Sequence, residues 1–194
     1  MNKTRLEAFS DGVLAIIITI MVLELKVPHE ASFEALAKLL PTFISYVMSF
    51  VYIGIYWGNH HHLLHAVRQV NSRIMWSNMG LLFFLSLIPF STAWMGENHF
   101  ASLPVAVYAV NLVLAGLSYS VLETAIRKHY PHSAALAEAL KKQKTKEQIS
   151  TVIYLTSIPC AFYYPQVSAV CFAIVAIMWV IPDKNIERAI KEEG

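Results

Sequence analysis

Charged residues are scarce in this chain. Asp, Glu, Lys and Arg make up 14% of its 194 residues, whereas roughly 25% is usual in soluble domains. Apolar residues make up 56% of the sequence, and the mean hydropathy is +0.50. This composition excludes an ordinary soluble protein and indicates an integral membrane protein.

Cysteine is also scarce. Cys160 and Cys171 lie in apolar stretches and lack the spacing of a metal site, so we expect buried thiols. The sequence contains no phosphate loop, nucleotide motif or pairing of a nucleophile with a base, and we therefore expect no enzyme and no cofactor. The net charge of +2 is small, and its distribution gives no surface for nucleic acid.

Long apolar runs are what the sequence does contain. A spanning helix needs about 20 mostly apolar residues, and six segments approach or exceed this length. They cover residues 5–26, 41–66, 73–96, 101–126, 147–164 and 167–182. We predict an all-α integral membrane protein in which residues 1–194 form a single domain of six transmembrane helices. Pro89 and Pro159 fall inside segments, where proline kinks a helix.

Basic residues predict the orientation of these segments, because loops rich in Lys and Arg remain on the cytoplasmic side. With both termini in the cytoplasm, only Lys26 and Lys38 of the 15 basic residues fall on the outer side. We therefore expect a multi-pass protein of the cell membrane whose amino and carboxyl termini are cytoplasmic.

The first segment joins a polar start to a long apolar continuation. Arg5, Phe9, Ser10 and Asp11 lie at its start, and Thr19 supplies the single hydroxyl of the apolar run that follows. Burying arginine and aspartate at the edge of a bilayer is costly unless they find partners. The pattern therefore indicates a built site rather than a plain membrane anchor.

The apolar run also has a helical face. At 100° per residue, an arc of about 100° holds Gly12, Ile16, Thr19, Ile20 and Leu23, while Asp11 lies roughly 140° from Ile16. Around a symmetry axis, several copies would form apolar rings with hydroxyls between them. Such rings close a pore by dewetting, and hydroxyls replace part of an ion's hydration shell. Helix packing or lipid contact explains the same stripe, so the periodicity leaves both readings open.

The start of the first segment also carries a family resemblance. The pattern Arg5-x-x-x-Phe9-Ser10-Asp11, continued by Ile16, Thr19, Met21 and Leu23, resembles the signature of the transmembrane protein 175 family of potassium channels. The resemblance implies a potassium-selective or potassium-permeable channel that conducts passively. Because this chain has one six-helix unit, the resemblance also implies a homotetramer with the first helix around the pore.

The resemblance divides the first segment into two groups of residues. It implies a pore constriction formed by Ile16, Ile20 and Leu23, with Thr19 as the hydroxyl layer. The resemblance also implies that a second group of residues positions the pore helix against its neighbours, namely Arg5, Phe9, Ser10 and Asp11.

A histidine-rich stretch ends the second segment. Its polar residues are Asn59, His60, His61, His62 and His65, and we expect them to hydrogen-bond other helices near Ser10 and Asp11. His61 and His65 are four residues apart and could share a ligand face, but no cysteine or carboxylate lies within the run, so we expect no metal.

Two alternatives to a channel remain open at this point. One is a proton-coupled secondary ion transporter that uses Asp11 and the histidines as a relay. The other is a membrane protein that binds haem or a metal through His61, His65 and their neighbours.

Overall fold

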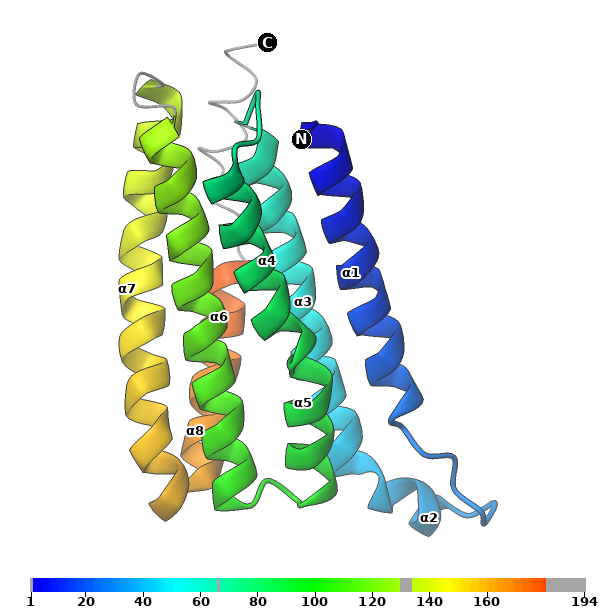
Figure 1. The fold of residues 1–194 in the computed structure, drawn as a ribbon. Coiled ribbons are helices and arrows are strands. Elements are labelled where there is room, and N and C mark those ends of the chain that lie inside the picture. Colours follow the sequence, from blue (N-terminus) through cyan, green and yellow to red (C-terminus); the bar gives the residue numbers. More distant parts are fainter. Residues whose placement is uncertain (1, 66, 130–133, 181–194) are drawn as a thin grey trace.

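The computed structural model describes residues 2–65, 67–129 and 134–180, with the backbone alone over 134–142. These residues form helices and short connections, and none of them is in a β-strand. The long helices lie side by side in a bundle, and a short helix, α2, lies at one end (Figure 1). The helices are α1 (Lys3–Leu23), α2 (Phe33–Lys38), α3 (Leu40–His65), α4 (Ser72–Ser86), α5 (Ile88–Glu97), α6 (Ser102–His129), α7 (Ala134–Tyr163) and α8 (Pro165–Val180).

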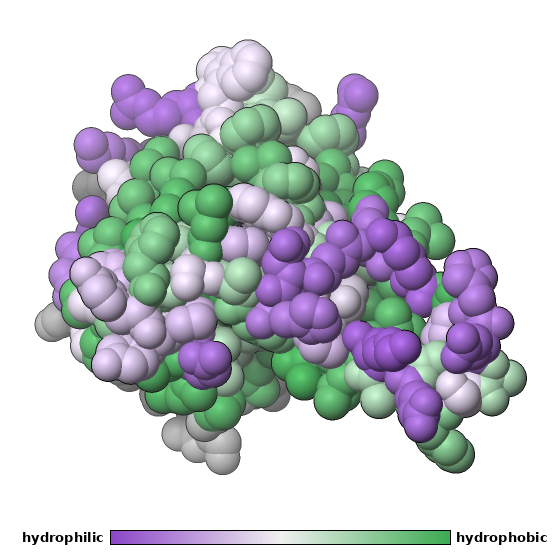
Figure 2. Space-filling model, turned by 90° about the horizontal axis from the view of Figure 1, so that it is seen from below, coloured by the Kyte–Doolittle hydropathy of each residue, from purple (hydrophilic) through white to green (hydrophobic). Residues whose placement is uncertain are grey.

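Several helices have the length and composition of membrane spans. Among the described residues, four segments qualify, namely Lys3–Leu23, Leu40–His65, Ser72–Glu97 and Ser102–His129, and α8 is a shorter apolar helix. The 21 residues of α1 extend about 31 Å, which matches the roughly 30 Å of hydrocarbon in a bilayer. Viewed from the α2 end, hydrophilic residues gather on one side of the face and at its rim, and hydrophobic residues lie between them (Figure 2).

Two helices differ in outline from the segments expected from the sequence. The segment 73–96 is interrupted, because α4 ends at Ser86 and α5 begins at Ile88. Pro89, which has no N–H to continue the helix, lies in the first turn of α5. The fifth segment, expected over 147–164, is the second half of α7, which begins at Ala134 and contains Pro159.

The orientation predicted from basic residues rests in part on the carboxyl terminus. Lys184, Arg188 and Lys191, together with the last residues of segment 167–182, lie outside the described residues.

The central helix of the bundle is α6. It packs against α4, α5, α7 and α8, and half of its 28 residues are buried. By contrast, α1 lies at the edge of the bundle against α3, α4 and α5, and α7 lies on the opposite side (Figure 1). Because α1 contacts its neighbours along one side only, the described residues leave much of its surface uncovered.

A close approach joins α3 to α5. Gly96 is buried near the end of α5, and a Cβ added there would lie 2.6 Å from the Cα of Thr42 and against the Ser45 hydroxyl. Since the Thr42 atom belongs to the backbone, the two helices would have to separate to admit any side chain. The absence of a side chain at position 96 therefore sets the distance between α3 and α5.

We predict that Gly96→Ala lowers the thermal stability of the purified protein in detergent, because overpacking costs about 1–3 kcal/mol. The matched control is Gly54→Ala on α3, where an added Cβ meets nothing within 4 Å and alanine favours the helix. Equal melting temperatures for the two variants would contradict the tight α3–α5 contact.

Candidate functional site

One face of α1 packs against the bundle. Its buried residues are Leu6, Ser10, Leu14, Ile17 and Met21, which recur every three or four positions and so lie on one side of a helix. Four of these side chains are apolar, and Ser10 is the polar exception. The rotation of α1 about its own axis is therefore set by this face.

The predicted stripe lies on the uncovered side of α1. The exposed fraction of the side chain is 58% for Ile16, 41% for Ile20 and 79% for Leu23. Thr19 and Gly12 on the same face are exposed as well. Toward the start of the helix, the stripe continues through Phe9 and Arg5, which are also exposed. The structure thus separates the stripe from the packing face.

The hydroxyl of Thr19 is oriented by its own helix. Its Oγ1 donates a hydrogen bond to the backbone carbonyl of Ile16 at 2.9 Å. Because the proton is used within the helix, the oxygen lone pairs of an exposed side chain remain available as acceptors. An acceptor between two apolar positions has the chemistry needed to contact a cation.

A buried hydrogen-bonded chain connects α1, α3 and α4. The side-chain amide of Asn78 donates to Ser10 Oγ at 2.9 Å, and Ser10 in turn donates to the carbonyl of Leu6 at 2.8 Å. On the other side, Asn78 Oδ1 lies 2.7 Å from His60 Nε2. A carbonyl oxygen only accepts, so His60 is the donor. All three side chains are buried, and each satisfies the others.

Asp11 lies beside this chain but has a different partner. The indole nitrogen of Trp57 on α3 donates to Asp11 Oδ1 at 3.0 Å. Ser10 and Asp11 therefore connect α1 to two different helices, α4 and α3. Near the start of α1, Lys3 donates to the carbonyl of His65 at 3.1 Å, which adds a contact to the end of α3.

The histidine-rich end of α3 separates into two parts. His60 is buried in the chain just described, whereas His61, His62 and His65 are exposed. The Asn59 side chain donates back to the Ile55 carbonyl of its own helix. Among the residues of this stretch expected to bond near Ser10 and Asp11, the hydrogen bonds described connect His60 to Ser10, and they do so through Asn78. Over the described residues, no group of three His, Cys, Asp or Glu side chains is arranged to hold a metal ion.

Two residues that complete the site were not expected as partners of the first helix. They are Asn78 on α4 and Trp57 on α3. Both are polar groups placed inside apolar segments, which is a detectable signal. The sequence alone does not give the depth and rotation of the helices that direct Asn78 toward Ser10 and Trp57 toward Asp11.

The far end of α1 is joined to α5 by an ion pair. Lys26 Nζ lies 2.6 Å from Glu97 Oε1, and the hydrogen bond to Glu97 raises the pKa of the exposed Lys26 ammonium. The ammonium therefore remains charged at neutral pH.

An open groove lies nearby between α1 and the α4–α5 segment, and its lining includes Ile16, Ile20, Glu24, Phe90 and Trp94.

Comparison with known proteins places this arrangement in a family. The family model described as "Endosomal/lysosomal potassium channel TMEM175" matches residues 5–89, the part that contains α1, α3, α4 and the start of α5. A protein of Chryseobacterium sp. (strain P1-3) named as a potassium channel is 50% identical over 192 residues, which cover 99% of this chain and all of that relative.

More distant similarities agree with this match. The crystal structure titled as a lysosomal potassium-selective channel TMEM175 homolog from Chamaesiphon minutus superposes with a TM-score of 0.78 at 27% identity, covering 92% of this chain and 96% of that one. The Gallus gallus protein named as the endosomal/lysosomal proton channel TMEM175 is 39% identical over 99 residues, which are 45% of this chain and 19% of that protein. The residue pattern of α1, the helical fold and the full-length relative agree, and the chain belongs to the TMEM175 family, whose members are ion channels and not enzymes.

Proposed function

We propose that this chain forms a homotetrameric potassium channel in which the exposed face of α1 lines the pore. Ile16, Ile20 and Leu23 form the hydrophobic constriction, and Thr19 supplies a layer of hydroxyl oxygens. Conduction is passive and needs no cofactor. The supporting observation is that the contacts of Ser10 and Asp11 turn the residues of this stripe away from the bundle that the chain itself forms.

The exposed face of α1 carries an oxygen acceptor near the middle of the helix. A face in contact with lipid needs no hydroxyl at mid-helix, whereas Thr19 presents acceptor lone pairs between Ile16 and Ile20. Oxygen acceptors substitute for part of the water around a cation, and the neighbouring apolar side chains exclude bulk water. These two properties support an ion pathway along this face.

A single copy of the chain leaves this pathway open on one side. With α1 at the edge of the bundle (Figure 1), several copies related by rotation would bring their α1 faces together around one axis. The groove beside α1 provides room for a neighbouring subunit. The names of the relatives supply the ion, since the Chryseobacterium relative is named as a potassium channel and the Chamaesiphon minutus structure as that of a potassium-selective channel homolog.

The proposal includes a membrane topology. The chain crosses the membrane six times, with α4 and α5 counted as one interrupted span and the second half of α7 as another. This topology puts the starts of α1 and α4 and the ends of α3 and α6 on the cytoplasmic side. We place the protein in the cell membrane with both termini in the cytoplasm.

Replacing Ile16 tests the constriction. We predict that Ile16→Asn increases single-channel conductance several-fold and reduces the preference for K⁺ over Na⁺, because a polar ring hydrates an apolar constriction. The measurement is single-channel recording in planar bilayers under K⁺ and Na⁺ gradients. The matched control is Ile177→Asn on α8, whose exposure of 62% is close to that of Ile16.

Unchanged conductance and selectivity in Ile16→Asn would place the constriction elsewhere. Equal effects in the two variants would indicate a general response to polar side chains at the protein surface.

Replacing Asn78 tests the connection between α1 and the bundle. We predict that Asn78→Leu lowers the potassium current and shifts the melting temperature downward, because Ser10 and His60 lose their buried partner, at a cost of about 1–3 kcal/mol. The measurements are potassium flux into liposomes and thermal unfolding in detergent. Asn98→Leu is the control, since Asn98 is exposed and bonds only to its own helix. Wild-type flux and stability in Asn78→Leu would contradict the positioning role.

A further inference from the structure

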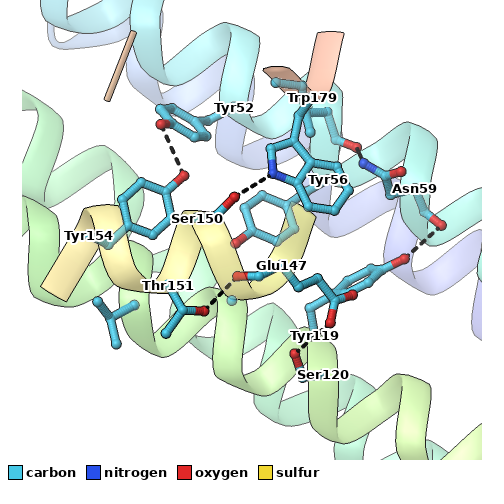
Figure 3. Close-up of a pocket in the computed structure, with 13 residues that line it drawn as sticks. Tyr52, Tyr56, Asn59, Tyr119, Ser120, Glu147, Ser150, Thr151, Tyr154 and Trp179 are labelled. Carbon is cyan, nitrogen blue, oxygen red and sulfur yellow. Dashed lines mark hydrogen bonds between the residues drawn. The ribbon is translucent and has the colours of Figure 1, made fainter. Parts of the chain in front are cut away.

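Two hollows in the molecule differ in how the chain covers them. The cavity between α3, α6, α7 and α8 has a volume of about 50 Å³, and the Tyr154 hydroxyl beside it donates to the Tyr52 hydroxyl at 3.0 Å (Figure 3). The groove between α1 and the α4–α5 segment is open and has a volume of about 580 Å³. Its apolar wall, which includes Ile20, Phe90 and Trp94, has no cover among the described residues.

A second uncovered apolar surface lies on α3. Phe43, Val47 and Phe50 are four and three residues apart, so they share one side of the helix, and their exposed fractions are 50%, 43% and 44%. The Tyr46 ring lies between the two phenylalanines, with its centroid 6.4 Å from Phe43 and 6.1 Å from Phe50. Trp57, seven residues beyond Phe50, is on the same side. We call Phe43, Val47 and Phe50 the α3 ridge.

The groove and the α3 ridge lie on opposite flanks of α1. At 100° per residue, Ile20 and Glu24 of the groove wall lie about 40° and about 80° from Ile16 in one direction. Asp11, which accepts a hydrogen bond from Trp57 on α3, lies about 140° from Ile16 in the other direction. Because Trp57 is on the side of α3 that carries the ridge, the ridge borders α1 on this second flank.

The groove and the α3 ridge also lie at similar heights along the bundle. Near the α2 end, α5 approaches α3 closely, because Gly96 lies against Thr42 and Ser45. From this approach, Phe90 is six residues away along α5, and Phe50 is five residues beyond Ser45 along α3. At 1.5 Å per residue, these distances are about 9 Å and about 8 Å, so the two rings lie at nearly the same level.

We propose that the α3 ridge of each copy packs into the groove of the next copy in the tetramer, an inference that rests on the proposed function. With α1 around the axis, each copy meets one neighbour on each flank of α1, and the two flanks present different surfaces. Such a contact is heterologous and closes into a ring under rotation. Rotation about the membrane normal preserves height, so Phe50 of one copy lies beside Phe90 of the next. Aromatic residues are enriched in protein interfaces.

Charges at the α2 end complement this contact. Glu24 lies on the groove wall, and Lys26 is paired with Glu97 instead, so Glu24 has no ion pair among the described residues. Lys38 is exposed at the end of α2, two residues before α3 begins, and it also has no ion pair there. A carboxylate therefore lies near the groove of one copy and an ammonium near the ridge of the other. Opposite charges favour this pairing of surfaces over others.

Disulfide crosslinking between copies tests the contact. Phe50→Cys and Phe90→Cys are made in separate full-length chains that carry different tags and have Cys160 and Cys171 replaced by serine. The two chains are coexpressed, reconstituted in liposomes and oxidised with copper phenanthroline. Because each chain has one cysteine, every crosslink joins two copies. The dimer on a denaturing gel should carry both tags, and dimers with one tag should be at least tenfold weaker.

Two control pairs use the same Phe90→Cys chain. Phe43→Cys lies on the same ridge but is displaced by seven residues, or about 10 Å. Ile174→Cys lies on α8 with an exposed fraction of 52%. Both should crosslink at least tenfold less than Phe50→Cys, and equal crosslinking in either control would overturn the proposal.

A second reporting pair, Val47→Cys with Trp94→Cys, keeps the test decisive if one variant fails to fold. No crosslinking in either reporting pair would leave the ridge to lipid and overturn the proposal. Lys38→Glu on the ridge chain should slow crosslinking about two- to fivefold at low ionic strength, and Glu24→Lys on the groove chain should restore the rate. An unchanged rate, or no restoration, would overturn the charge pairing.

Potassium flux through the same liposomes separates this inference from the proposed function. Flux without crosslinking would retain the channel and overturn the packing of the ridge in the groove. Crosslinking combined with unchanged conductance in Ile16→Asn would retain the packing and place the constriction elsewhere.

Discussion

The structure depends on the cost of an unpaired polar group in a membrane. Ser10 and Asp11 lie near the start of α1, and each has a partner on another helix. Asn78 and Trp57 provide these partners. The two contacts lie on adjacent sides of α1 and, together with its buried packing face, fix the rotation of the helix. The residues of the Ile16 stripe face away from the bundle as a consequence, although none of them takes part in the contacts.

The helical bundle places two polar sites in separate surroundings. The face of α1 is at the edge, where a neighbouring subunit completes it in the proposed tetramer. The small cavity lined by Glu147 lies between α3, α6, α7 and α8, where α6 and α7 pack closely.

The sequence alone predicts the apolar segments, the family resemblance of the first helix and the stripe on α1. It can do so because the length of an apolar run, a short residue pattern and a period of 3.6 residues are local properties. The proline at position 89 also indicates, from the sequence alone, an interruption between α4 and α5. The extension of α7 to Ala134 was not predicted as one helix, since hydropathy detects only its apolar half. Contacts such as Trp57 with Asp11, and a cavity built from residues as distant as Tyr52 and Trp179, depend on how helices pack, which one sequence alone does not determine.

The most direct test of the central claim is the accessibility of cysteines along α1 to a water-soluble thiol reagent. Cys160 and Cys171 are first replaced by serine, and single cysteines are then introduced at Ile16, Ile20 and Leu23, or at Val170, Ile174 and Ile177 on the exposed face of α8. If this face lines the pore, the reagent should block the potassium current at the first three positions and leave it intact at the others. Block at Val170, Ile174 and Ile177 without block at Ile16, Ile20 and Leu23 would contradict a pore lined by this face.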